Sequence, residues 1–492
     1  MTTISKAAYR HLLDADASPE EVVIAYHERT KHHFHRYAAS LGCMDWTTQP
    51  DPFRRYPGAD LVRLLLPKQG RPLPYWQLYL ERRAILDAKA WTQLCAPFPE
   101  GSFLVGLASV HWREAWKYGE RAFRYCQHDA GHALATVRIA AAALGWGLVL
   151  LDGVSDSAIA GLFGLSRGDD YGTAEREEPE LLALVTCGLP LTSAQLLNEP
   201  TAGSIGAQWN GRANTLSPEH RVEWPVIDEV AQATRRSESA PITEDFSRFP
   251  TEEQLFGIPI RHGLLSAETA ILGRRSAVAM DGSTAISQEA FFRTLARLIP
   301  TRDRRSMPWD AIPWRPRVHL GLFVHRVDGV PRGLYALARD QDKLAALQEV
   351  MRREFRWQHL PSCPPGLPLY LLQEGDCRAL AATVSCGQHI AGDGAFSVGM
   401  IVDYMDSLTT YGAAFYRNLF WEAGMVGQML YLEAEETGIR STGIGCYFDD
   451  PVHEVFGITS RQWQSFYHFT VGGQVEDTRL TTLPSYDFDE EQ

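Results

Sequence analysis

The chain has 492 residues, 45% of them hydrophobic and 22% charged, which is ordinary for a folded protein with a large buried core. At roughly 100–200 residues per domain, this length leaves room for two to four domains. The 47 basic and 60 acidic residues give a net charge of −13, so we expect no nucleic-acid partner. The uncharged stretch in the most apolar region, residues 139–151, is shorter than the about 20 residues of a membrane-spanning helix. We therefore expect no membrane partner.

The N-terminal sequence MTTISKAAYRHLLDADASPEEV indicates a cytoplasmic protein. It lacks the apolar core of a secretory signal, and it contains acidic residues that transit peptides avoid. The 8 cysteines are spread along the chain without a Cys-x-x-Cys pair. This argues against a zinc ribbon or a thioredoxin motif and predicts free, mostly buried thiols.

An internal repeat dominates the organisation of the chain. Residues 118–165 align with residues 411–458 without a gap, at a shift of 293 positions and with ten identities, where chance gives on the order of three. Each copy predicts a long helix, a glycine at its C-terminal end, a short strand and a short helix that ends in Phe-Gly. The predicted long helices are residues 123–143 and 416–436, and the glycines are Gly145 and Gly438. Two similar units are implied.

The two long helices share a pair of small residues, Ala130-Gly131 in the first and Ala423-Gly424 in the second, and the second adds Gly427. Small side chains allow two helix backbones to approach closely, so we expect these helices to pack on each other in an internal pseudo-dimer. Each unit is expected to close with a strand, near Gly188 and near Gly472. The polar residues 191–262 show little periodicity, and we place the boundary near residue 250, which gives units 1–250 and 251–492.

Two short segments of the second unit could bind a ligand. Arg274, Arg275 and Ser276 offer two guanidinium groups and a hydroxyl to an anion, although they could equally be a solvated surface group. Gly443 and Gly445 follow the repeat helix, where the lack of a Cβ would let a planar ligand reach the backbone. A tight turn between two elements is the alternative for these glycines.

Together these motifs resemble a known family. The segment RRS, the helix pattern AGMVGQ, the turn GIG with its FDD, and the closing TVGGQVEDTRL are similar to the nitroreductase-like flavoproteins. The branch they resemble is that of the thiazoline and oxazoline dehydrogenases of SagB/ThcOx type. The resemblance covers most of residues 262–485 and, more weakly, residues 20–200. It implies an α+β fold of two fused units, each with a central antiparallel or mixed sheet flanked by helices, and FMN bound where the units meet.

The resemblance also implies roles for individual residues. Those that would hold the phosphate and ribityl chain of FMN are Arg274, Arg275, Ser276 and Arg479. Those that would approach the N5 and O4 edge of its ring are Gly443, Ile444 and Gly445. Gln428 would face the ring or the ribityl chain. Lys117 and Tyr118 match a Lys-Tyr pair that assists proton removal, where a buried lysine or a tyrosine sharing its proton serves as general base. The alternative is an exposed lysine and a packed tyrosine.

The two copies depart from the family in complementary ways. In the first unit the glycine turn is replaced by Leu150, Leu151 and Asp152, and no arginine matches Arg479. Its opening segment keeps Arg29, Thr30 and Lys31, which could still bind an anion. In the second unit Thr410 replaces the lysine before Tyr411. These losses predict one FMN per chain, seated in the second unit and completed by the first.

The sequence contains other polar residues that could belong to a site but are not assigned to one. His128 and His132 are four residues apart on the first long helix, but a third ligand is missing, so we expect no metal. His32, His33 and His35 indicate a polar face or part of an anion pocket. Thr47, Thr48 and Gln49 lie in a proline-rich loop, and such a loop reaches the flavin in relatives; an ordinary surface turn is the alternative.

The resulting hypothesis is an FMN-dependent oxidoreductase that transfers a hydride. Its substrate would be an azoline in a peptide-derived compound or a small quinone or nitro compound, and nothing in the sequence decides between them. The alternative is a non-catalytic scaffold or binding protein of the same fold in a peptide-modification pathway. The use of NAD(P)H is left open, as is the choice between a monomer with an internal pseudo-dimer and a homodimer.

Overall fold

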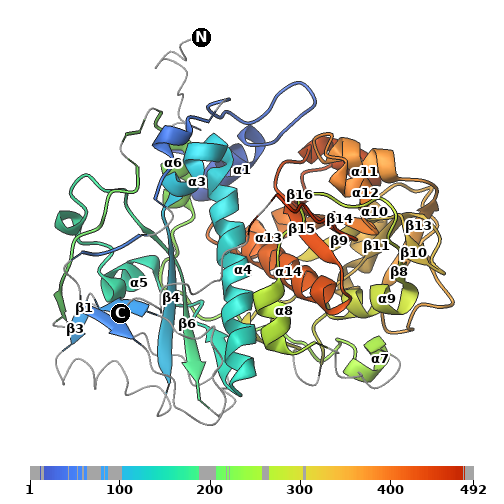
Figure 1. Cartoon of the computed structure of the whole chain (residues 1–492), viewed down its shortest axis with the longest axis horizontal. Coiled ribbons are helices and arrows are strands. Elements are labelled where there is room, and N and C mark those ends of the chain that lie inside the picture. The colour runs from blue at the N-terminus through green and yellow to red at the C-terminus, as the bar shows by residue number, and fades with distance from the viewer. Residues whose placement is uncertain are drawn as a thin grey trace.

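The computed structural model describes residues 12, 16–42, 44–51, 54–57, 60–63, 79–82, 84–86, 102–187, 207–217, 219–220, 222–256, 265–302, 306–479 and 481. The architecture is α+β, as predicted, with two sheet-containing parts on either side of a pair of long central helices (Figure 1). Among the described residues, no helix is both long and apolar enough to cross a membrane.

The second part of the chain is built on a seven-stranded sheet in the order β12-β13-β11-β9-β14-β16-β15, and each neighbouring pair is antiparallel. Every residue of β14 and β16 is buried, because helices cover both faces of the sheet there. The strands are β9 (Val318–Val324), β11 (Gly333–Leu337), β12 (Gln358–His359), β13 (Leu369–Glu374), β14 (Phe396–Asp403), β15 (Arg440–Ile444) and β16 (Trp463–Gly472). A short parallel pair, β8 (Ile286–Ser287) with β10 (Val327–Asp328), lies beside it.

One helix of this second part begins after a serine cap. Ser287 precedes α9, and its hydroxyl accepts a hydrogen bond from the N–H of Ala290 at 3.1 Å, which caps the helix. The helices are α7 (Glu252–Phe256), α8 (Ala267–Gly273), α9 (Gln288–Ala296), α10 (Leu344–Val350), α11 (Arg378–Val384), α12 (Ile390–Asp393), α13 (Tyr404–Tyr411), α14 (Phe415–Glu436) and α15 (Asp449–Phe456).

The first part of the chain has a smaller sheet, β4-β6-β5, in which β6 pairs antiparallel with both neighbours. Its strands are β4 (Phe103–Ser109), β5 (Gly147–Leu150) and β6 (Glu178–Thr186). Its helices are α1 (Pro19–Arg29), α3 (His111–Tyr118), α4 (Ala122–Ala143), α5 (Asp156–Phe163) and α6 (Pro225–Ala233). Two further antiparallel pairs are β1 (Asp60–Arg63) with β2 (Tyr79–Arg82), and β3 (Ala84–Leu86) with β7 (Ala207–Trp209).

The repeat seen in the sequence is a repeat of structure. The elements β4, α3, α4, β5 and α5 each begin 293 residues before their counterparts β14, α13, α14, β15 and α15. The strand order β4-β6-β5 is also that of β14-β16-β15. Gly145 and Gly438 follow the two long helices with φ of 74° and 71°, the left-handed conformation that ends a helix. The predicted helices and their glycine ends are thus confirmed.

The helices α4 and α14 pack backbone to backbone, and their contacts are reciprocal. A Cβ on Gly131 of α4 would lie 2.2 Å from the carbonyl oxygen of Trp421 on α14. A Cβ on Gly424 of α14 would lie 2.3 Å from the carbonyl oxygen of His128 on α4. Both glycines are therefore required by the helix crossing, as the small-residue pairs predicted.

Two further expectations concern the polar residues 191–262 and the strands that close the two units. Residues 191–262 were expected to contain no core element, but α6 buries Val226, Ile227 and Val230 in the main hydrophobic core. The expectation is wrong because this helix has nine residues, too few for a helical period to stand out among polar neighbours. The strand β16 ends at Gly472 as predicted, β6 ends at Thr186, and Gly188 lies outside the described residues.

Candidate functional site

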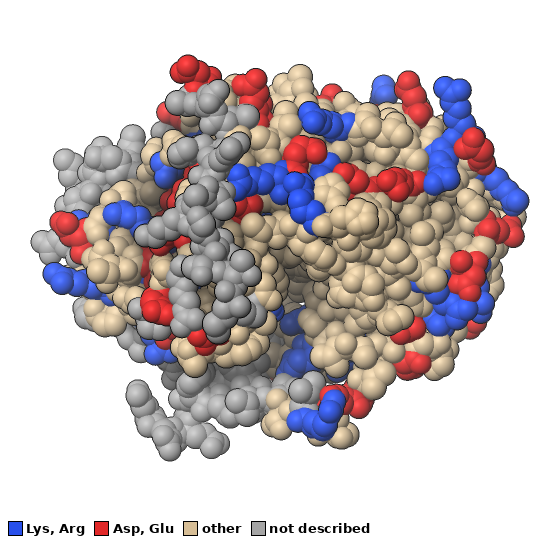
Figure 2. Space-filling view, turned by 90° about the horizontal axis from the view of Figure 1, so that it is seen from above, with Lys and Arg blue, Asp and Glu red and all other residues tan. Residues whose placement is uncertain are grey.

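Several of the residues singled out from the sequence gather where the end of β15 meets the pair α4 and α14. The second part contributes the segment after α8, the C-terminal half of α14 and the turn after β15, while the first part contributes α3 and α4. Seen from above, the surface is hollowed near its middle, and basic side chains are visible in the hollow (Figure 2).

Tyr431 on α14 connects three of these residues. Its hydroxyl lies 2.8 Å from the Oγ of Ser276 and accepts a hydrogen bond from the N–H of Gly443 at 3.2 Å. The guanidinium of Arg274 lies 4.7 Å from the centre of the Tyr431 ring, a cation–π contact. Ser276 also forms a parallel bridge with Ser441 of β15. The structure thus brings Arg274, Ser276 and Gly443 together around one phenol.

Arg275 and Arg479 have partners of their own. The Arg275 guanidinium donates to the carbonyl oxygens of Leu272 and Arg274 and so caps the C-terminal end of α8. The Arg479 side chain is 87% exposed and forms an ion pair with Asp477 at 2.7 Å. It follows the segment after β16 that runs beside residues 279–281. Neither guanidinium is shown in contact with the Tyr431 group.

The faces of the glycine turn are covered by tyrosines. A Cβ on Gly443 would lie 2.1 Å from the Tyr467 hydroxyl, and a Cβ on Gly445 would lie 2.2 Å from the Tyr125 ring. The glycines were expected to let a planar ligand approach the backbone, but in this structure they accommodate phenol rings. Ile444 is 3% exposed and packs into the core under α15, so only its backbone faces the turn.

Gln428 contacts the first part of the chain through His132. The His132 Nδ1 lies 3.1 Å from the Gln428 Oε1, and its Nε2 lies 3.4 Å from the Tyr467 hydroxyl. The neighbouring His128 stacks on Tyr467 with ring centres 4.1 Å apart, and its Nε2 lies 3.1 Å from the carbonyl oxygen of Phe466. The two histidines therefore both contact Tyr467 but have different hydrogen-bond partners. In the described part of the chain, no cluster of three or more His, Cys, Asp and Glu residues could hold a metal.

His132 is expected to remain uncharged in mildly acidic solution, because burial lowers its pKa to about 4. A histidine whose pKa is lowered on folding stabilises the fold above about pH 6.5, and this contribution is lost as the pH falls towards 4. The NMR signal of its Cε1 proton, identified by its loss in His132→Gln, should therefore not titrate between about pH 5.5 and 8. A midpoint near the ordinary value of about 6.5 would contradict the burial.

Lys117 and Tyr118 lie at the outer edge of this group. The Tyr118 ring is 4.3 Å from the ring of Tyr125, which touches Gly445. The Lys117 Nζ lies 4.9 Å from the centre of the Tyr118 ring. Lys117 is exposed, so the idea that burial activates it as a base is wrong for this structure. Lys117 lies in the last turn of its helix, α3, which ends at Tyr118.

The same helix α3 borders a cavity of about 580 Å³. Trp112 and Trp116, one turn apart on α3, form one wall, and Trp46 of the short helix Trp46–Thr48 packs edge-on against Trp116 at 5.6 Å. Thr47 and Thr48, candidates from the proline-rich loop, also line the cavity, and Thr48 accepts a hydrogen bond from the Trp116 indole at 3.0 Å. The cavity has the aromatic walls suited to a flat apolar group.

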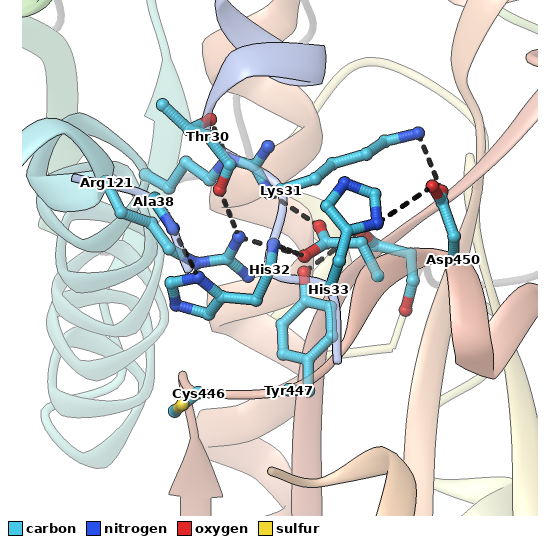
Figure 3. Close-up of polar contacts among 12 residues, drawn as sticks. Thr30, Lys31, His32, His33, Ala38, Arg121, Cys446, Tyr447 and Asp450 are labelled. Carbon is cyan, nitrogen blue, oxygen red and sulfur yellow. Dashed lines mark hydrogen bonds and ion pairs between the residues drawn. The ribbon is translucent and has the colours of Figure 1, made fainter. Parts of the chain in front are cut away.

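The opening segment of the first unit does not leave an anion cradle. Arg29 forms an ion pair with Glu120 at 2.6 Å, and Lys31 forms one with Asp450 at 3.0 Å (Figure 3). Thr30 is fully buried and donates its hydroxyl hydrogen to the carbonyl oxygen of Tyr26. The expectation that an anion could still bind here is therefore wrong, because carboxylates of the chain already neutralise both cations.

The side chain of Asp152 also has a hydrogen-bond partner within the protein. Its carboxylate, which replaces the last glycine of the turn in the first unit, accepts a hydrogen bond from the N–H of Ile242 at 2.7 Å. Burial raises its pKa. His32 is buried as well, so the expected polar face of His32, His33 and His35 is wrong for its first member.

Two reciprocal ion pairs join the two parts of the chain. Arg124 of α4 pairs with Asp449 of α15 at 2.9 Å, and Arg417 of α14 pairs with Asp156 of α5 at 2.7 Å. Arg121 also pairs with Asp449, at 3.0 Å, and both groups are buried (Figure 3). Burial alone would raise the pKa of Asp449, but the two arginines hold it well below its ordinary value.

Comparison with known proteins agrees with this architecture. Residues 368–473 match the model of a family described as the Nitroreductase family. The chain is similar to a crystal structure from Anabaena variabilis assigned as a nitroreductase, with 18% identity, 92% of this chain and 99% of that chain covered, and a TM-score of 0.61. No curated protein sequence matches the chain. The fold is therefore that of nitroreductases, and the Anabaena match extends over both parts.

Two further similarities cover only about half of the chain. One is to the Escherichia coli microcin synthetase McbBCD complex with truncated pro-MccB17 bound, at 15% identity, 45% and 77% coverage of the two chains, and a TM-score of 0.31. The other is to a protein of Ralstonia eutropha assigned as a nitroreductase, at 12% identity, 48% and 99% coverage, and a TM-score of 0.31.

The residues at this site fit the phosphate end of FMN by their chemistry. Arg274 and Ser276, which meet at Tyr431, offer a guanidinium group and a hydroxyl that can bind a phosphate by charge-assisted hydrogen bonds, while the Arg275 guanidinium caps α8. At the ring end, the N–H of Gly443, which would face the flavin ring, donates a hydrogen bond to the Tyr431 hydroxyl. A flavin could therefore form hydrogen bonds with Ser276 and Gly443 only if Tyr431 gives up its own hydrogen bonds to them. Sequence reasoning missed Tyr125, Tyr431 and Tyr467, because each of them contacts residues that are distant in the sequence.

Proposed function

We propose that the protein is an FMN-dependent oxidoreductase that transfers two electrons as a hydride, with one FMN beside the turn after β15. The observation that carries this proposal is the convergence of residues from both units on that turn. Arg274 and Ser276 reach it through Tyr431, and Tyr118 reaches it through Tyr125. The match of residues 368–473 to the Nitroreductase family supports it.

We also infer that the two units relate to each other as the subunits of a two-fold dimer do. In such a dimer, residue i of one subunit contacts residue j of the other, and j contacts i. The ion pairs Arg124–Asp449 and Arg417–Asp156 have this reciprocity, because the members of each pair are repeat equivalents of the other. The SagB/ThcOx assignment and the units 1–250 and 251–492 stay part of this proposal.

In this proposal the phosphate and ribityl chain are bound by Arg274, Arg275 and Ser276, with Arg479 joining from the C-terminal segment. The backbone of Gly443, Ile444 and Gly445 borders the ring, and Gln428 orients its polar edge from α14. FMN, when bound, supplies a two-electron acceptor or donor. Lys117 and Tyr118, at the outer edge, hold or deliver the proton that accompanies the hydride.

The substrate is an azoline of a peptide-derived compound, or a quinone or nitro compound. The cavity lined by Trp46, Trp112 and Trp116 lies on the helix that carries Lys117 and Tyr118, and its aromatic wall suits any of these flat groups. NAD(P)H is a candidate reductant if the reaction runs as a reduction.

Titration with FMN, followed by quenching of flavin fluorescence, tests the proposal. We expect about one FMN per chain, and at least tenfold weaker binding in Arg274→Gln, about 1.4 kcal/mol. Arg378→Gln is the matched control, because this exposed arginine at the start of α11 pairs with Asp376. Tyr431→Phe should bind FMN more tightly than the wild type, since it removes the hydroxyl that competes for Ser276 and Gly443.

Each outcome of this titration is informative. Two FMN per chain would contradict the loss of the first site, and a protein that binds no FMN would leave the scaffold alternative. Equal binding in Arg274→Gln and Arg378→Gln would remove Arg274 from the site. Weaker binding in Arg479→Ala would assign this arginine to the phosphate, and unchanged binding would leave it as the surface partner of Asp477.

A further inference from the structure

Cys386 and Cys446 face each other across two loops of the second unit. Their Sγ atoms are 2.7 Å apart, against about 2.05 Å in a disulfide bond. Cys386 follows α11 with a φ of 55°, and Cys446 directly follows Gly445 of the glycine turn. Both are free and half-buried. A small movement is enough to join them.

The two loops are tied together by hydrogen bonds that do not involve the thiols. The Gln388 side-chain amide donates to the carbonyl oxygen of Cys446 at 2.9 Å. The N–H of Phe448 donates to the carbonyl oxygen of Val384 at 2.8 Å. Cys386 therefore lies between two residues that are bound to the opposite loop, and Cys446 is itself bound through its carbonyl oxygen, so the backbones of the two loops hold the cysteines close together.

His32 of the first unit makes the pair asymmetric. Its Nδ1 accepts a hydrogen bond from the N–H of Ala38 at 2.9 Å, so the neutral ring carries its hydrogen on Nε2, which is free to donate towards Cys446 (Figure 3). The contact with Cys386 and the hydrogen bond with His32 lower the pKa of Cys446 to about 5, against the effect of burial. The same Cys446 contact and burial raise the pKa of Cys386.

The other cysteines with a shifted pKa differ from Cys446. Burial raises the pKa of Cys363 and of Cys377 to about 12 and that of Cys126 well above its ordinary value. A thiolate is the nucleophile in disulfide exchange, so within the described residues these three thiols are poor attacking groups and Cys446 is a good one.

We propose that Cys386 and Cys446 form a reversible dithiol–disulfide site that reacts with small disulfides of the glutathione type. The Cys446 thiolate attacks one sulfur of the small disulfide, which forms a mixed disulfide and releases one thiolate of the small molecule. The Cys386 sulfur, as it loses its proton, then attacks the Cys446 sulfur and displaces the second. Two protein thiols and one disulfide become one protein disulfide and two small thiols, with electrons and protons balanced.

Reaction of the intact, reduced protein with glutathione disulfide tests this, and it requires no flavin, so its result is separate from that of the FMN titration. Thiols are counted after quenching and unfolding, and linked peptides are identified by mass spectrometry. In the wild type we expect the loss of two thiols and a Cys386–Cys446 link. Cys386→Ser should accumulate glutathione on Cys446, and Cys446→Ser should react at least tenfold more slowly. Cys187→Ser, which removes an exposed lone thiol, is the control.

Three results would overturn the proposal. A wild type that keeps both thiols shows that the pair does not react, whatever the variants do. A Cys446→Ser variant that reacts as fast as the wild type removes Cys446 as the attacking group. A stable glutathione adduct on wild-type Cys446, with no link to Cys386, shows that the second thiol does not close the disulfide.

Discussion

Asp449→Asn is expected to lower the free energy of unfolding by about 3–5 kcal/mol, because it leaves two buried arginines without their counter-charge. The Asp449 carboxylate receives hydrogen bonds from Arg121 at 3.0 Å and from Arg124 at 2.9 Å, and from the N–H of His32 at 2.9 Å. An asparagine can accept one of these bonds, but it cannot neutralise the guanidinium groups. Urea denaturation followed by circular dichroism measures the loss.

The next residue in the chain provides the control. Asp450 pairs with Lys31 at 3.0 Å, but its side chain is 41% exposed, and Lys31 keeps a second partner in Glu28 at 3.0 Å. Asp450→Asn should therefore cost clearly less than Asp449→Asn. An equal loss in both variants would show that the Asp449 cluster is no stronger than a surface pair.

The pH dependence of Asp449→Asn has a definite sign. The folded pKa of Asp449 lies below its unfolded value, so its contribution to stability is present above about pH 4 and is lost as the pH falls further. The difference in stability between wild type and Asp449→Asn should therefore shrink in acid. A difference that stays constant below pH 4 would mean that the carboxylate charge is not what the arginines require.

The repeat made much of the fold predictable from the sequence. Ten identities at one shift were enough to place both long helices within one residue of their observed starts and to predict their close packing. The pairs Arg124/Arg417 and Asp156/Asp449 are among these identities, so the signal for the reciprocal ion pairs was present. What the alignment could not show is that each arginine binds the aspartate of the other copy, because that depends on how the units face each other.

The candidate site was less predictable, for a physical reason. A motif such as GIG indicates where a backbone is open, but not which side chain fills the opening. Tyr467 comes from a strand 24 residues after Gly443, and Tyr125 comes from the other unit, so no local spacing connects either with the turn. The sequence could not show that Lys117 is exposed either, because the same short pattern fits a buried base and a solvated helix end.

Gly424→Ala is expected to destabilise the protein by about 3 kcal/mol, although the same change in an exposed helix stabilises it by about 1 kcal/mol. The new methyl group would lie 2.3 Å from the His128 carbonyl oxygen and 2.9 Å from the His132 backbone nitrogen. Backbone atoms of a long helix cannot move aside singly, so α4 and α14 would have to separate. Thermal and urea unfolding of the variant measure the cost.

Gly427→Ala, one turn further along α14, separates this backbone collision from the general effect of adding a methyl group. Its Cβ would meet ring atoms of His132 at 2.8 Å and of Phe469 at 3.0 Å, and these side chains can shift. We therefore expect a smaller loss than for Gly424→Ala. If Gly424→Ala were as stable as the wild type or more stable, the helices would not cross backbone to backbone. The reciprocal contact of Gly131 with Trp421, and with it the two-fold relation of the units, would then have to be abandoned.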